Sequence, residues 1–141
     1  MTSYARSERA ALADLLDDLG PDAPTIDDGW ATRDLTAHLV VRERRPLAMP
    51  GIAVPALAWL TEREMTAMCR RPYGEVVQLV RSGPPRWNPL ALVPALDEVV
   101  NGSEFFVHHE DVRRAQDGWQ PRALSEEQQA ALWSGLHRTS G

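Results

Sequence analysis

The sequence predicts an all-α fold, built as a bundle of four main helices with one additional short helix. Apolar residues recur at three- and four-residue spacing along most of the chain, which is the pattern of amphipathic helices. No segment shows a convincing alternation of apolar and polar residues, so no β-strand is expected. Prolines fall between these segments or at their first positions, where they separate one predicted helix from the next.

The first two helices are predicted from apolar spacing and from their end signals. Leucines share one face of residues 3–19, and Gly20 ends this segment. Thr32 is expected to cap the second helix, with Asp34 in its first turn near the positive end of the helix dipole. This helix is expected to end before Pro46.

In the middle of the chain, the predicted helix boundaries follow from the positions of the prolines. Pro55 suits the first position of a third helix that runs to about Arg70, and a short helix is expected at residues 74–81. A stiff, proline-rich connection then leads to Pro94.

Pro94 is expected to open a long helix that ends near Gly118. Ser125 and Gln128 have capping-box spacing at the start of the last helix. Residues 137–141 are expected to form a polar tail.

Composition places the chain among globular proteins, and we interpret residues 1–141 as one domain. Hydrophobic residues make up 43% of the chain, and charged residues make up 25%. A net charge of −5 and a pI near 5.3 argue against a nucleic-acid-binding protein, which usually carries a basic patch. No apolar run is long enough to span a membrane, and the N-terminus lacks the layout of a signal peptide. We therefore expect a cytoplasmic protein.

Two residue counts bear on the source. Cys69 is the only cysteine, which excludes an internal disulfide and is consistent with a reducing compartment. All 15 basic residues are arginine. Arginine codons are largely GC-rich, so the composition indicates a high-GC bacterial genome.

The candidate chemistry lies on the long helix that Pro94 opens. Glu104, His108 and Asp111 follow at steps of four and three residues and therefore form one stripe. Glu104 and His108 can direct a carboxylate and an imidazole at a common centre, as helix bundles do when they bind divalent metals. A facing helix must supply a further ligand, and His38 on the apolar face of the second helix is the candidate.

Two histidines and one carboxylate with open positions suit zinc, iron, nickel or manganese. Asp111 lies one turn beyond His108 and could accept a hydrogen bond that orients its ring. The alternative is that these histidines are structural, because a Glu–His pair at this spacing is usually no more than a pair of neighbours.

Other polar residues receive simpler interpretations. His109 lies about 100° around the helix from this stripe. It is the alternative ligand to His108 if the register differs, but we expect it to pack or to face solvent. The arginine clusters at residues 42–45 and 113–114 are interpreted as solvated helix ends. Arginines beside Cys69 could lower its pKa, but no histidine is close in sequence, so a nucleophilic role is not predicted. The candidates to line a pocket are Trp30, Arg42, Trp87 and Phe105, with a hydrophobic staple at Trp30 and surface packing at Trp87 as the simpler interpretations.

Two motifs resemble those of the DinB/YfiT-like superfamily, in its mycothiol-dependent maleylpyruvate isomerase N-terminal branch. The first, Gly-Trp-x-x-Arg-Asp-Leu-x-x-His-Leu, covers residues 29–39 and contains His38. The second, Glu-x-x-x-His followed by Asp three residues later, contains Glu104, His108 and Asp111. Together they resemble the small actinobacterial metal-binding proteins of this branch over nearly the whole chain.

The resemblance implies a DinB-like four-helix bundle that binds one divalent metal ion through His38, Glu104 and His108. Zinc is the first expectation, with nickel, iron and manganese as alternatives. Mycothiol is implied as a cosubstrate that binds the metal as a thiolate and then adds to an electrophilic substrate. The chain departs from relatives at residues 27–28, where they commonly carry a cysteine, and in lacking their usual C-terminal α/β segment.

We therefore interpret the chain as a metal-dependent and thiol-dependent transferase or isomerase, with no catalytic acid or base assigned. The expected partners are a small-molecule thiol and an electrophilic substrate, without nucleic acid or membrane. The oligomeric state is left open, with a homodimer as one option. The alternative function is a non-catalytic metal-binding or stress-response module of the same fold.

Overall fold

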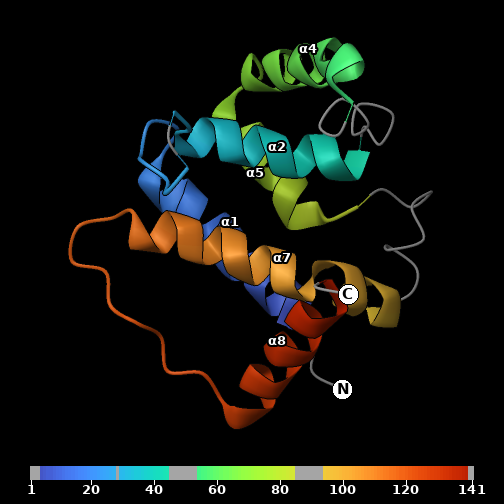
Figure 1. Ribbon diagram of the computed structural model, residues 1–141. Coiled ribbons are helices and arrows are strands. Elements are labelled where there is room, and N and C mark those ends of the chain that lie inside the picture. Colours follow the sequence, from blue (N-terminus) through green and yellow to red (C-terminus); the bar gives the residue numbers. More distant parts are fainter. Residues whose placement is uncertain (1–3, 28, 45–53, 85–93, 140–141) are drawn as a thin grey trace.

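The computed structural model of the chain is all-helical over the residues that it describes (Figure 1). It describes the backbone of residues 4–27, 29–44, 54–84 and 94–139, and within these ranges the side chains outside 94–103 and 135–139. The helices are α1 (Tyr4–Leu19), α2 (Thr32–Arg44), the 3₁₀ turn η2 (Pro55–Leu57), α4 (Ala58–Cys69), α5 (Tyr73–Ser82), α7 (Pro94–Arg114) and α8 (Glu126–Thr139). The predicted all-α class is confirmed, because these ranges contain no strand and only an isolated bridge between Pro24 and Ala31.

Several predicted helix ends are confirmed. Pro94 is the first residue of α7. The hydroxyl of Ser125 accepts a hydrogen bond of 3.1 Å from the backbone N–H of Gln128, so Ser125 caps α8 as expected. Gly20 follows α1 with a φ of 77°, a conformation that favours glycine.

The helical segment expected from Pro55 does begin there, but its first turn is a 3₁₀ turn and it becomes α-helical only at Ala58. Two other predicted ends were wrong. The long helix ends at Arg114, because the side-chain amide of Gln116 donates to the carbonyl of Val112 and replaces a further helical turn. Finally, α8 continues to Thr139, so residues 137–139 belong to a helix and not to a tail.

Thr32 does not act as the predicted cap of α2. Its hydroxyl donates a short hydrogen bond to the carbonyl of Gly20, which fastens α2 to the end of α1. Asp34 caps the helix instead, because its carboxylate accepts a 3.0 Å hydrogen bond from the backbone N–H of Ala31.

The hydrophobic core lies among α1, α2, α5 and α7, and one residue of α4 closes it. α1 packs against α5 and α7, α2 packs against α4 and α5, and α8 packs against α7. Figure 1 shows α4 on one side of α2 and α7 on the other, with α8 at one end of α7. The buried apolar side chains of this core include Leu12, Leu16, Leu35, Leu39, Val40, Val41, Met68, Val77, Val80, Phe105 and Val112. Among the described helices, none combines the length and apolar character that crossing a membrane requires.

A buried ion pair joins these four helices. The Arg9 guanidinium of α1 donates to both carboxylate oxygens of Glu43 on α2, at 2.6 and 2.8 Å. It also donates to the carbonyl of Val80 on α5 at 3.0 Å, and it lies 4.3 Å from the ring centroid of Phe105 on α7. Arg9 and Glu43 are only 6% and 4% exposed. The interpretation of residues 42–45 as a solvated helix end is therefore wrong at Glu43.

We expect Arg9→Ala to lower the free energy of unfolding by about 3–5 kcal/mol, because it removes the guanidinium that donates to both oxygens of the buried Glu43 carboxylate. Urea denaturation measures this change. The exposed Arg71–Glu75 pair supplies the control, and Arg71→Ala should change stability by less than about 1 kcal/mol. The double variant Arg9→Met, Glu43→Leu should recover much of the loss. A single Arg9 variant as stable as the surface control would contradict this account.

Candidate functional site

The predicted ligands from two distant segments lie next to one another in the structure. The ring centroids of His38 on α2 and His108 on α7 are 5.6 Å apart. The Nε2 atom of His108 lies 3.3 Å from Oε2 of Glu104, one turn earlier on α7. The side chain of His108 is 14% exposed and that of Glu104 is 50% exposed, so the group lies at the edge of the core and opens to solvent.

The spacing of these atoms can be compared with that of metal ligands. Two atoms bound to one tetrahedral zinc at about 2.0–2.1 Å lie about 3.3–3.4 Å apart, which matches the separation of Glu104 and His108. The ring of His38 is adjacent to this pair. Among the side chains that the structure describes, no three carboxylate, thiol or imidazole groups are spaced so that they could hold a metal ion together. The donor types fit a divalent metal, and two of the three are at ligand spacing.

Asp111 lies behind His108, as its position one turn later suggests. Its Oδ2 atom is 3.7 Å from Nδ1 of His108, which is an ion-pair distance but too long for a hydrogen bond. Nδ1 of His108 is buried and has no hydrogen-bond partner among the described residues. A shift of a few tenths of an ångström would let Asp111 accept from this nitrogen and leave Nε2 free as a ligand.

The electrostatics of the group favour a neutral imidazole beside a charged carboxylate. Burial lowers the pKa of His38 below 6.5, and the positive charges of His108 and Arg42 lower it further. The hydrogen bond with His108 lowers the pKa of Glu104, against the opposing effect of burial. Neutral imidazole and ionised carboxylate are the forms that bind a metal.

A loop between α1 and α2 places an aromatic ring at this site. The ring centroid of Trp30 is 5.3 Å from that of His38. The loop is fastened to α7, because the backbone N–H of Ile26 donates to the carbonyl of Asp111 at 3.2 Å. The charge of Asp27, in the same loop, raises the pKa of Asp111, although burial is the larger cause.

Of the other residues considered from the sequence, Arg42 lies close enough to affect the pKa values of His38 and Glu104, whereas Phe105 and Cys69 do not join this group. The ring of Phe105 is fully buried in the core under Arg9. Trp87 lies outside the described residues. Burial and the charge of Asp34 raise the pKa of Cys69, so the thiol is not activated as its neighbouring arginines suggested.

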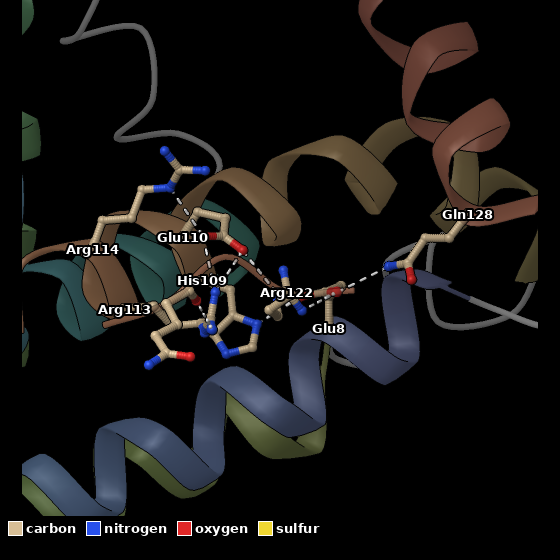
Figure 2. Close-up of polar contacts among 8 residues, drawn as sticks. Glu8, His109, Glu110, Arg113, Arg114, Arg122 and Gln128 are labelled. Carbon is tan, nitrogen blue, oxygen red and sulfur yellow. Dashed lines mark hydrogen bonds and ion pairs between the residues drawn. The ribbon is translucent and has the colours of Figure 1, made fainter. Parts of the chain in front are cut away.

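His109 is buried and does not face solvent. Its Nδ1 atom lies 2.7 Å from Oε2 of Glu8 on α1 (Figure 2). Because a carboxylate can only accept, Nδ1 carries the hydrogen in this bond. The neighbouring histidines of α7 therefore have different surroundings, with His108 beside His38 and His109 against α1.

Glu8 and Glu110 anchor the C-terminal part of the chain through Arg122. The Arg122 guanidinium donates to Glu8 at 2.8 Å and to Glu110 at 2.7 Å (Figure 2). Gln128 of α8 donates to Glu8 at 3.1 Å, and Arg113 donates to both oxygens of Glu110. Burial would raise the pKa of Glu8, but its bonds with His109 and Arg122 outweigh this and lower the pKa below 4.5.

Sequence reasoning missed the buried polar residues Glu8, Arg9 and Glu43. One signal could have found the first two. They precede Leu12 and Ala13 by one helical turn, on the face of α1 that the leucines predict to be buried. Charged residues on such a face need partners, and their partners are far away in the sequence.

Comparison with protein-family models, with characterised proteins and with solved structures finds no match for this chain.

We expect the stability of the protein to fall in acid partly through Glu8. Its folded pKa is lowered, so its contribution is fully present above about pH 5 and is lost as the pH falls through the folded value. Glu8→Gln should be less stable by about 1–3 kcal/mol at pH 7 and should lose less additional stability between about pH 5 and 3. Thermal melts over this range measure both effects.

The exposed Glu127→Gln on α8 is the control for this experiment, and its acid profile should follow that of the wild type. Parallel acid profiles for the wild type and Glu8→Gln would be inconsistent with a lowered pKa at Glu8.

Proposed function

We propose that the protein binds one divalent metal ion, zinc in the first instance, through His38, Glu104 and His108. Nickel, iron and manganese suit the same donor set. The observation that carries the proposal is the meeting of two histidines from distant segments, with rings 5.6 Å apart, beside a carboxylate 3.3 Å from one of them. A ligand set of two imidazoles and one carboxylate leaves positions open on the ion.

We further propose that the open positions receive a small-molecule thiol of the mycothiol type. A bound divalent metal lowers the pKa of such a thiol and makes the thiolate available at neutral pH. The residues of the chain would bind and orient: Asp111 aligns the ring of His108, and Trp30 covers one side of His38. The thiolate would then add to an electrophilic substrate, which makes the protein a transferase or isomerase.

The arrangement of α1, α2, α5 and α7 supports a four-helix bundle of the DinB-like type as part of this proposal. These helices share one core, and the candidate ligands stand on α2 and α7 at the edge of that core. In helix bundles, metal sites are built from side chains on helices that face one another.

Metal analysis of the purified protein tests the ligand set. We expect about one equivalent of zinc in the wild type, and more than a tenfold loss of affinity in His38→Ala, Glu104→Ala and His108→Ala, because each removes a ligand. Asp111→Asn should weaken binding by about 10–100-fold. Competition with a chromogenic chelator gives the affinities.

The matched control is the adjacent histidine. His109→Gln keeps a hydrogen-bond donor toward Glu8, so it should bind zinc as the wild type does while it melts at a lower temperature. The ligand assignment would be abandoned if His38→Ala and Glu104→Ala bound as much zinc as the parent protein.

Cobalt substitution tests the thiol chemistry. On addition of mycothiol to the cobalt-loaded protein, a thiolate-to-cobalt charge-transfer band should appear, because the thiolate enters an open position. Conjugation of the thiol to a test electrophile should follow. Metal binding with neither the band nor conjugation would instead support a non-catalytic metal-binding module.

A further inference from the structure

Arg42 is a partly buried cation at this site, and one nitrogen of its guanidinium lacks a hydrogen-bond partner among the described residues. It lies on α2 one turn after His38, so both side chains emerge from the same face of the helix. Its Nη1 atom is buried and has no hydrogen-bond partner among the described residues. An unsatisfied buried donor on a charged group is unfavourable by more than an ordinary lost hydrogen bond, and it calls for a physical explanation.

Other arginines in the structure show what this side chain normally receives. Arg9 is paired with both oxygens of Glu43, and Arg122 bridges Glu8 and Glu110. Arg42 forms no ion pair with any side chain that the structure describes. The chain thus supplies carboxylates to the guanidinium groups of Arg9 and Arg122, although Nη2 of Arg122 is also buried without a partner. Arg42 has no described carboxylate at ion-pair distance.

The charge of Arg42 acts on the candidate metal ligands. It contributes to the lowered pKa of Glu104, after the hydrogen bond with His108, and to the lowered pKa of His38, after burial and His108. A divalent ion held with one carboxylate is still positively charged, and the guanidinium adds to this charge. An anion that reaches the site therefore meets two cations.

We propose that Arg42 binds the oxyanion group, a carboxylate or a phosphate, of a small molecule that binds at the metal site together with the thiol. This inference rests on the proposed metal site and assigns its ligand to the class of small anionic molecules. The planar guanidinium presents two parallel N–H groups that match the two oxygens of such a group. Binding satisfies the Nη1 donor that the chain leaves without a partner.

The test uses the full-length, cobalt-loaded protein and two thiols of similar size. 3-Mercaptopropionate carries a carboxylate and 2-mercaptoethanol is neutral, and the thiolate-to-cobalt band reports the affinity of each. We expect the wild type to bind 3-mercaptopropionate about 10–100-fold more tightly, the range of a hydrogen bond to a charged group. Arg42→Gln should reduce this ratio to within about twofold, and Arg42→Lys should keep part of it because it retains charge without the fork.

The two thiols differ in their intrinsic affinity for cobalt, but this difference is the same in every variant. It therefore cancels when the ratio of the two affinities is compared between variants. The control is Arg71→Gln at an exposed position after α4, which should retain the wild-type ratio. Competition by acetate and by inorganic phosphate distinguishes the two oxyanions: the one that displaces 3-mercaptopropionate in the wild type but not in Arg42→Gln is the class that Arg42 binds.

Equal affinities of the wild type for the two thiols would overturn the assignment even if Arg42→Gln failed to fold. So would a preference that survives in Arg42→Gln, or competition by neither anion. If Arg42→Gln no longer binds cobalt, Arg42 acts by positioning Glu104. That result also overturns the assignment of Arg42 as the residue that binds the oxyanion. A wild type that binds no cobalt, or that gives no band with either thiol, overturns the proposed function and this inference together, so the two failures are distinguishable.

Discussion

The packing of the core depends on one buried cation. Arg9 reaches from α1 to a carboxylate on α2, a carbonyl on α5 and an aromatic ring on α7. Each contact satisfies part of a guanidinium that has been removed from water, and the four helices must stand in one arrangement for all of them to form. Apolar burial drives these helices together without direction, whereas this ion pair favours a particular register. The candidate metal ligands on α2 and α7 depend on that register, because they lie at the edge of the same core.

Neighbouring residues in a single turn of α7 contact two different helices. Successive residues point about 100° apart, so His108 meets α2 while His109 meets α1. Glu110, the next residue, binds arginines that follow it, including Arg122. The segment that carries α8 is therefore held by the same turn that carries a candidate ligand. A movement of this turn would therefore change the contacts of Arg122 with Glu8 and Glu110.

The helices could be predicted because their signals are local. Pro94 opens α7 and Ser125 caps α8, since proline restricts its own backbone and a serine hydroxyl binds an N–H three residues away. The wrong assignments involve partners that sequence spacing does not reveal. Thr32 has the residue type of a cap, but its hydroxyl bonds to Gly20. The candidate site was predictable only within one helix. Helical spacing placed Glu104 next to His108, but it does not determine how far this pair lies from His38 on another helix.

By itself, the sequence determined the all-α class, most helix ends and the stripe of Glu104 and His108 on one helix. All of these follow from periodicities of three to four residues and from the restricted backbones of proline and glycine. Only the tertiary structure decided which charges are buried and what they meet. It paired Arg9 with Glu43, set His38 beside His108 and left Nη1 of Arg42 without a hydrogen-bond partner. The reason is physical: a buried charge is tolerated only where several distant segments supply partners at once, and no local pattern records that meeting.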